Sequence, residues 1–136
     1  MTMIGAATEV VRDDERALID ALVTIGGRHR DDHDIFHISR TLIRLHEANL
    51  EALGGDGQPQ QRFAAGGSLL GDLRALHLLY AQASIDWVIL GQGAQAVRDA
   101  ALLETVSRCH PETLRGMKWT VTRLKLAAPQ VLAGNG

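Results

Sequence analysis

Three histidines, His29, His33 and His37, follow one another at steps of four with aspartates between them, in the segment HRDDHDIFH. Residues four apart share one face of a helix, so His33 and His37 have a spacing that suits two ligands of one metal ion. The same segment is predicted to begin a helix, with Asp31 or Asp32 as the N-cap. Because aspartate is ordinary at a helix start, we interpret this cluster as a solvated helix start rather than a metal site.

A second pair of reactive side chains, Cys109 and His110, combines a potential nucleophile with a potential base. Adjacent residues rarely point at each other, and no third group is evident that would orient the histidine, so we interpret the pair as inert. Cys109 is the single cysteine of the chain, which excludes an internal disulfide and favours a reducing compartment.

The chain is organised around the stretch from Ser68 to Ala101. Its apolar residues recur at alternating steps of four and three, the spacing of a continuous helical stripe: Leu69, Leu73, Leu76, Tyr80, Ala83, Trp87, Leu90, Ala94, Val97 and Ala101. Residues off the stripe are apolar as well, namely Leu70, Leu78, Leu79, Ile85, Val88 and Ile89. A helix that is apolar on most sides must be covered on most sides. We therefore predict a central place for it in a helical bundle.

Asp86 is a carboxylate inside this apolar stretch, in the sequence ASIDWVIL. A buried, unpaired carboxylate is costly, so Asp86 needs a cationic partner, a hydroxyl group, a metal ion or a raised pKa. In a chain rich in arginine, the preferred partner is an arginine of the same chain. A partner across a subunit interface ranks next, and a metal ion third.

Three further helices complete a single domain over residues 1–136. The first is predicted from Thr8 to Ile25, and Gly26 and Gly27 end it. The second starts at the Asp31–Asp32 turn, ends at Gly54 and Gly55, and exposes Arg40, Arg44, Glu47 and Glu51. The fourth is predicted from Asp99 to Ala128, broken near Pro111, with a frayed tail over residues 129–136.

Residues 54–67 form a glycine-rich loop between the second and third helices. Fourteen extended residues span about 46 Å, whereas a helix of 22 residues is only about 33 Å long. The loop can therefore run the length of the bundle and leave these two helices parallel. The alternative is a slack surface loop between antiparallel helices.

Two helical hairpins, a long crossover and a central apolar third helix resemble the ferritin-like superfamily over nearly the whole chain. The stretch from Leu76 to Leu132 is also similar to a group of uncharacterised small bacterial helical proteins. The resemblance implies an all-α, ferritin-like four-helix bundle with a long crossover loop and a broken fourth helix.

Active members of that superfamily bind two metal ions through Glu on the first and third helices and Glu-x-x-His on the other two. This chain has no Glu-x-x-His motif. Where the motif has glutamate, three positions before the histidine, this chain has Ile43 before His46 and Ser107 before His110. The resemblance therefore implies at most a depleted, mononuclear iron or manganese site. Its candidate ligands are Asp20, His46, Asp86, Glu104 and His110. The alternative is that both histidines are boundary or capping residues.

The composition narrows the function classes. A net charge of -2 gives no reason to expect a nucleic acid or an anionic membrane as a partner. The most apolar run is interrupted by polar residues and is too polar for a membrane span, and the N-terminus does not read as a signal peptide. We therefore expect a cytoplasmic protein.

Taken together, the residues predict a non-catalytic helical module that acts through its packing surfaces, as a homodimer or with a partner protein. The alternative prediction is a ferritin-like metal protein that binds iron or manganese and handles electrons or oxygen.

Overall fold

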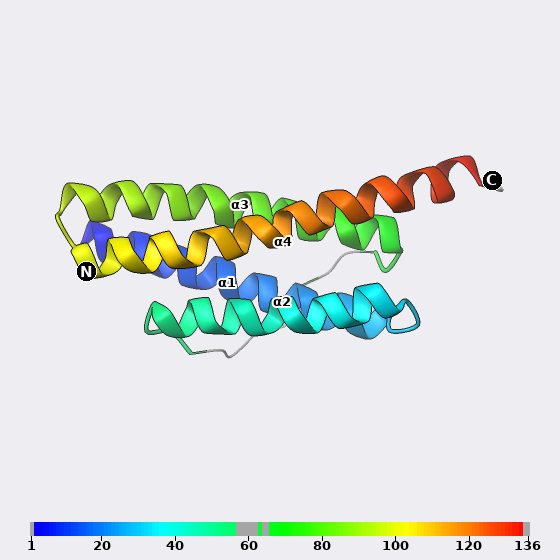
Figure 1. Cartoon of the computed structure of the whole chain (residues 1–136), viewed down its shortest axis with the longest axis horizontal. Coiled ribbons are helices and arrows are strands. Elements are labelled where there is room, and N and C mark those ends of the chain that lie inside the picture. Colours follow the sequence, from blue (N-terminus) through cyan, green and yellow to red (C-terminus); the bar gives the residue numbers. More distant parts are fainter. Residues whose placement is uncertain (1, 57–62, 64–65, 135–136) are drawn as a thin grey trace.

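Four α-helices and no strand make up the part of the chain that the computed structural model describes, residues 2–56, 63 and 66–134 (Figure 1). They are α1 (Met3–Arg28), α2 (His33–Ala52), α3 (Leu69–Ala96) and α4 (Ala100–Ala133). The prediction of an all-helical bundle is therefore confirmed. None of the described helices is both long enough and apolar enough to cross a membrane.

Each helix begins with a side chain that accepts a backbone N–H of its first turn. The predicted caps Asp32, Ser68 and Asp99 accept from Ile35, Gly71 and Leu102, respectively. The prediction for α1 was wrong at both ends. Thr2 caps it in place of Thr8, and the helix continues through Gly26 and Gly27 to Arg28. A glycine is useful at position 26, because a Cβ there would lie 3.1 Å from the Cβ of Ser39 on α2.

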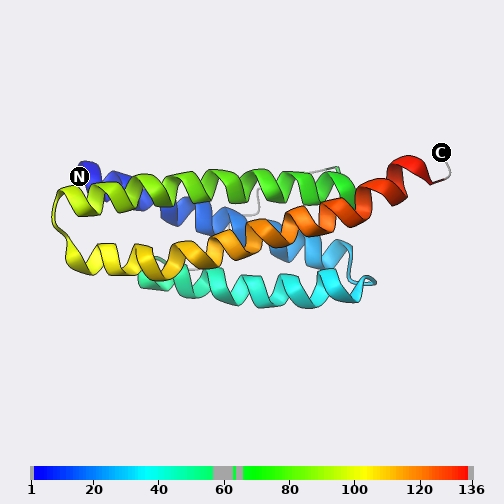
Figure 2. The same ribbon diagram turned by 45° about the horizontal axis from the view of Figure 1, so that its top comes forward.

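The helices form two antiparallel hairpins, α1–α2 and α3–α4, which pack so that α1 lies against α3 and α2 against α4 (Figures 1 and 2). Helices α2 and α3 stand at diagonally opposite corners of the bundle and run in the same direction. The chain between them must therefore connect opposite ends of the bundle, which is the crossover arrangement. Phe63 belongs to this connection, and its backbone N–H donates to Asp20 of α1. Residues 57–62 and 64–65 lie outside the described residues.

The apolar stripe of α3 forms much of the core. Leu73, Leu76, Tyr80, Trp87 and Leu90 are fully buried. They pack into two clusters, one toward each end of the bundle, with apolar residues of the other helices. The predicted solvated face of α2 is also confirmed, since its four charged residues are exposed: Arg40, Arg44, Glu47 and Glu51.

The expectation that α3 is covered on most sides was wrong. Leu78, Ile85, Val88 and Ile89 are between 43% and 57% exposed. The physical reason is that α3 packs against only two neighbours, α1 and α4, so one side of it faces outward. Apolar composition therefore did not translate into burial on this side.

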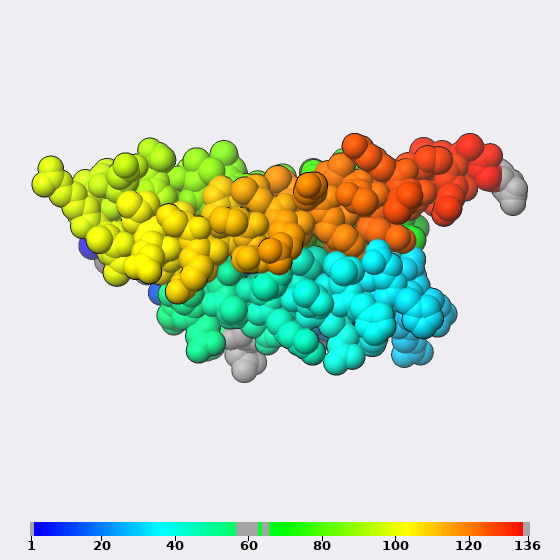
Figure 3. Space-filling view, viewed as in Figure 1, coloured from blue at the N-terminus to red at the C-terminus, as the bar shows by residue number. Residues whose placement is uncertain are grey.

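The expected break near Pro111 is absent, because α4 is one continuous helix that contains both Pro111 and Pro129. Pro111 and Ser107, whose carbonyl loses its helical partner to the proline, are both exposed, so water can satisfy that carbonyl. The extended packing of α4 against α3 offsets the remaining loss of helix stability that the proline causes. The expected frayed tail is helical through Ala133, and its last turns project past the other helices (Figure 3). Residues 135–136 lie outside the described residues.

Gly116 of α4 generates a test of this packing, because a Cβ there would overlap the ring of Tyr80. We expect Gly116→Ala to lower the free energy of unfolding by about 1–3 kcal/mol, the usual cost of overpacking a core. Gly27→Ala is the matched control, because a Cβ at Gly27 meets no atom within 4 Å. Urea unfolding of both variants measures the difference, and equal stability would contradict the packing described here.

Candidate functional site

A fully buried carboxylate, Glu15, lies in the middle of the bundle. It belongs to the buried stripe of α1, between Val11 and Leu18, at the spacing of the other core positions. A charge in this place is expensive unless its oxygen atoms are hydrogen-bonded. The surrounding helices therefore must supply donors.

Each of the other three helices supplies a donor to Glu15. Its Oε1 atom accepts hydrogen bonds from Asn49 Nδ2 at 3.1 Å, Trp87 Nε1 at 3.0 Å and Thr113 Oγ1 at 3.1 Å. Its Oε2 atom lies 2.6 Å from Nδ1 of His46. The carboxylate thus accepts from α2, α3 and α4 at once, and we call this set of residues with Tyr80 the Glu15 network.

The network continues from His46 to Tyr80, whose hydroxyl oxygen lies 2.7 Å from Nε2 of the imidazole. A carboxylate can only accept, so Nδ1 of His46 carries a proton. Burial, together with the charge of Glu15, raises the pKa of Tyr80 above its ordinary value, so the hydroxyl keeps its proton. In the neutral imidazole, Nε2 then accepts the hydrogen bond that Tyr80 donates.

The Glu15 network resembles a catalytic relay in its residue types, but no substrate can reach it. Glu15, His46, Tyr80 and Thr113 are fully buried, and Asn49 nearly so. Each of these side chains is hydrogen-bonded to another member of the network. The arrangement therefore fixes how four helices meet, and it has no vacant side for chemistry.

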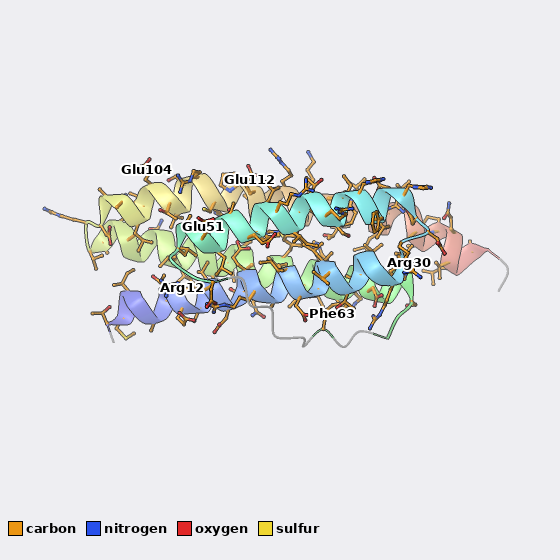
Figure 4. The ribbon with its side chains drawn as sticks, turned by 90° about the horizontal axis from the view of Figure 1, so that it is seen from below. Arg12, Arg30, Glu51, Phe63, Glu104 and Glu112 are labelled. Atoms are coloured by element: carbon orange, nitrogen blue, oxygen red, sulfur yellow. The ribbon has the colours of Figure 1, made fainter. Side chains whose placement is uncertain are left out.

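The five candidate metal ligands do not gather at one place in the bundle. Asp20 is buried and accepts the backbone N–H of Phe63 at 2.8 Å, which fastens the crossover to α1. Glu104 is exposed and points outward from α4 (Figure 4). His46 belongs to the Glu15 network, Asp86 lies beside Asp14 of α1, and His110 contacts Ser84 of α3. Among the described residues, no three His, Cys, Asp or Glu side chains gather closely enough to hold a metal ion. The residues present thus do not fit an iron or manganese centre of the kind the resemblance implies.

Asp86 faces another carboxylate, contrary to the expected arginine. It is half-buried, and its carboxyl lies within hydrogen-bonding reach of Asp14 on α1. Gln82 of α3 donates through Nε2 to Oδ1 of Asp14 at 3.1 Å. Burial, followed by the contact with Asp86, raises the pKa of Asp14 from 3.8 to about 8, so this pair holds a proton at neutral pH. The prediction failed because α3 is half-open to solvent here, and a proton can take the place of an arginine.

The histidine cluster at the start of α2 is largely exposed, in agreement with the interpretation of a solvated helix start. His33 and His37 are exposed and stack on each other. Asp32 caps α2 and pairs with Arg123 of α4 at 3.0 Å. His29, in contrast, turns inward and lies 2.8 Å from the buried carboxylate of Asp72.

A groove of about 410 Å³ runs between α3 and α4, with His110, Ser107 and Gln92 among its lining residues. Nε2 of His110 lies 3.0 Å from the hydroxyl of Ser84, and burial lowers the pKa of His110, which favours the neutral imidazole. Cys109 is buried, and its burial raises the pKa of the thiol. A buried thiol that retains its proton is a poor nucleophile, which fits the inert interpretation of this pair.

Comparison of the chain with models of protein families, with curated proteins and with solved structures finds no match. The resemblance to the ferritin-like superfamily therefore stays a prediction.

Sequence reasoning missed Glu15 as a candidate site residue. A signal was present, because Glu15 occupies a position of the stripe that runs through Val11, Leu18, Leu22 and Ile25. A polar residue in register with a core stripe indicates a buried polar contact. Asn49 and Thr113 carry the same signal in α2 and α4.

The Glu15 network predicts that substitutions of its two closest members, His46 and Glu15, lower the stability of the protein by unequal amounts. We expect His46→Leu to lower the free energy of unfolding by about 3–5 kcal/mol, because it leaves the Glu15 charge buried without its closest partner. Glu15→Gln should cost less, since its amide can donate to Nδ1 of the other imidazole tautomer.

The double variant completes a thermodynamic cycle measured by urea unfolding. With no charge left to strand, we expect it to be more stable than His46→Leu alone. Additive losses would show that the two side chains do not interact.

The pair of Asp14 and Asp86 predicts a pH dependence of stability. An acid whose pKa is higher in the folded state binds more protons folded than unfolded, so folding stability falls as pH rises between about 4 and about 8. The contribution is largest at the acid end of this window and absent above it. Thermal unfolding across this range should therefore show a downward trend that Asp14→Asn reduces. The same slope in both proteins would contradict the assignment.

Proposed function

We propose that this protein is a non-catalytic helical module that pairs with a second copy of itself through the outward side of α3. The observation that carries the proposal is the absence of charge on that side. The exposed residues of α3 between positions 78 and 96, which we call the outer strip, include no acidic or basic side chain. They are Leu78, Ala81, Gln82, Ile85, Val88, Ile89, Gln92, Gln95 and Ala96.

An uncharged exposed face is unusual for a helix at the surface of a bundle, where the outer side normally carries charged residues. Helix α2 follows the usual pattern, with four charged residues on its outward side. The outer strip has instead four large aliphatic side chains, Leu78, Ile85, Val88 and Ile89. Contiguous exposed apolar surface of this kind marks an interaction site.

The spacing of the outer strip fits a helical partner. Leu78, Ile85 and Gln92 are seven residues apart, and Ala81, Val88 and Gln95 repeat the interval three positions later. Positions that repeat in this way form the seam of helices packed at a shallow angle. The small alanines allow close approach, and the branched side chains supply the contact area.

The size of the face favours a partner that also touches α1 and α4. The outer strip is about 28 Å long at 1.5 Å per residue, and one helix is about 10 Å wide. That footprint falls short of the roughly 800 Å² per subunit that stable interfaces bury. Val10 on α1 and Leu114 on α4 are exposed and extend it. Val10 lies one turn from Asp14, and Leu114 lies one turn from His110. Both Asp14 and His110 hydrogen-bond to side chains of α3.

A second copy of the chain is the partner that suits this face. A two-fold axis brings the same patch together from both subunits, so the patch must complement itself. Like charges would meet across such an axis, and the outer strip has none. Aliphatic and amide side chains can pack against their own copies without electrostatic cost.

The test is the mass of the protein in solution, measured by light scattering and sedimentation equilibrium. We expect the wild type to be a dimer and the variant Ile85→Glu/Ile89→Glu to dissociate with a dissociation constant raised at least about 100-fold, or about 2.7 kcal/mol. Circular dichroism checks that the helices persist.

Val23→Glu is the matched control, because Val23 is 49% exposed but lies on another side of α1. It follows Asp14 by nine residues, about two and a half turns, and so points away from α3. We expect this variant to stay dimeric. A monomeric wild type at every soluble concentration would overturn the proposal. So would a dimer that survives the double substitution and is lost in Leu132→Glu, at the projecting end of α4.

A further inference from the structure

The contact between α1 and α3 contains an acidic junction, formed by Asp14, Gln82 and Asp86. Asp14 is only 6% exposed, although it carries a carboxyl group. Its Oδ1 atom accepts from Gln82, whereas its buried Oδ2 atom has no donor among the described N–H and O–H groups, and the carboxyl group of Asp86 lies within hydrogen-bonding reach of Asp14. A buried oxygen atom without a donor is the kind of group that a bound ion satisfies.

The acidic junction also lacks a positive partner. Ten ion pairs link described side chains, and neither Asp14 nor Asp86 takes part in any of them. The neighbouring carboxylate, Glu15, adds negative charge, and His46 is its partner in the core. Two carboxyl groups therefore face each other with no side-chain cation between them. A proton or a metal ion can neutralise them.

We propose that the acidic junction is a binding site for one hard divalent cation, with Mg²⁺ as the ion that fits best. Its ligands would be Oδ2 of Asp14, one carboxylate oxygen of Asp86 and, after rotation of the side-chain amide, Oε1 of Gln82. Mg²⁺ prefers oxygen atoms, retains several of its water molecules, and is commonly held by only one or two carboxylates. Half-buried Asp86 leaves a side open for those water molecules.

The chemistry of the donors separates this site from an iron or manganese centre of the ferritin-like kind. All its ligands are oxygen atoms at the edge of the α1–α3 contact, and no histidine is included. Bound Mg²⁺ would bridge the two hairpins, since Asp14 belongs to the first and Asp86 to the second. All three ligands belong to one chain, although Gln82 is also part of the outer strip.

Isothermal titration calorimetry with MgCl₂ at pH 8.5 tests the site, at a pH where protons compete little for the carboxylates. We expect one Mg²⁺ per chain, and an affinity at least about tenfold weaker in Asp14→Asn and in Asp86→Asn, because each loses a charged ligand. CaCl₂ in a parallel titration is expected to bind more weakly, since the site offers few protein ligands for the larger ion. Electron paramagnetic resonance of added Mn²⁺ counts the sites independently.

Asp13→Asn is the matched control, because it removes the same charge one residue away, where Asp13 pairs with Arg16. We expect it to bind Mg²⁺ as the wild type does. An equal loss of affinity in Asp13→Asn would show diffuse attraction to an acidic surface and overturn the proposal. The absence of binding to the wild type would overturn it as well, and would leave the junction as a pair that shares a proton. Should Asp14→Asn fail to fold, Asp86→Asn at the half-buried position decides the question.

Discussion

The buried charge of Glu15 is the constraint on which the packing of the bundle depends. A carboxylate at the centre must accept hydrogen bonds, and its donors come from Asn49, Trp87 and Thr113, with His46 at the second oxygen atom. Each of these residues has to face the same point. Rotation of any one helix by a single residue position, about 100°, would remove its donor. Apolar packing alone tolerates many rotations, so the network selects one of them.

The same register places a second polar contact beside the first. Asp14 and Glu15 are adjacent on α1, and Asp86 and Trp87 are adjacent on α3. Glu15 meets Trp87 inside the core, so Asp14 must meet Asp86 at the edge of the same contact. One of the two contacts matches a donor with an acceptor, whereas the other opposes two acids. The acidic junction is thus a consequence of the rotation that the core requires.

The sequence was sufficient to predict the elements of the fold, because each stripe recurs at helical spacing and three N-caps are strong signals: Asp32, Ser68 and Asp99. The length of the loop was compatible with a crossover between parallel helices and also with a slack surface loop between antiparallel ones. Only the directions of α2 and α3 in the structure decide between the two arrangements. The prediction of a break at Pro111 was wrong, because the carbonyl group that loses its helical hydrogen bond belongs to exposed Ser107 and can bond water. Such a proline need not end a long, well-packed helix. The buried network was out of reach without the helix pairing, since spacing along one helix does not reveal what it faces.

The error about α3 is the most informative of these differences. A helix that is apolar on nearly all sides can be covered by its own chain, or by another molecule. The first explanation accounts for Trp87 and Leu90, which are buried, but not for Ile85 and Ile89 on the opposite side. Exposed aliphatic residues carry a risk of aggregation that charged residues would remove at little cost to the fold. The outward side of α2 carries charged residues, whereas the outward side of α3 carries aliphatic ones. This difference favours a role for the outer strip in contact with a second copy.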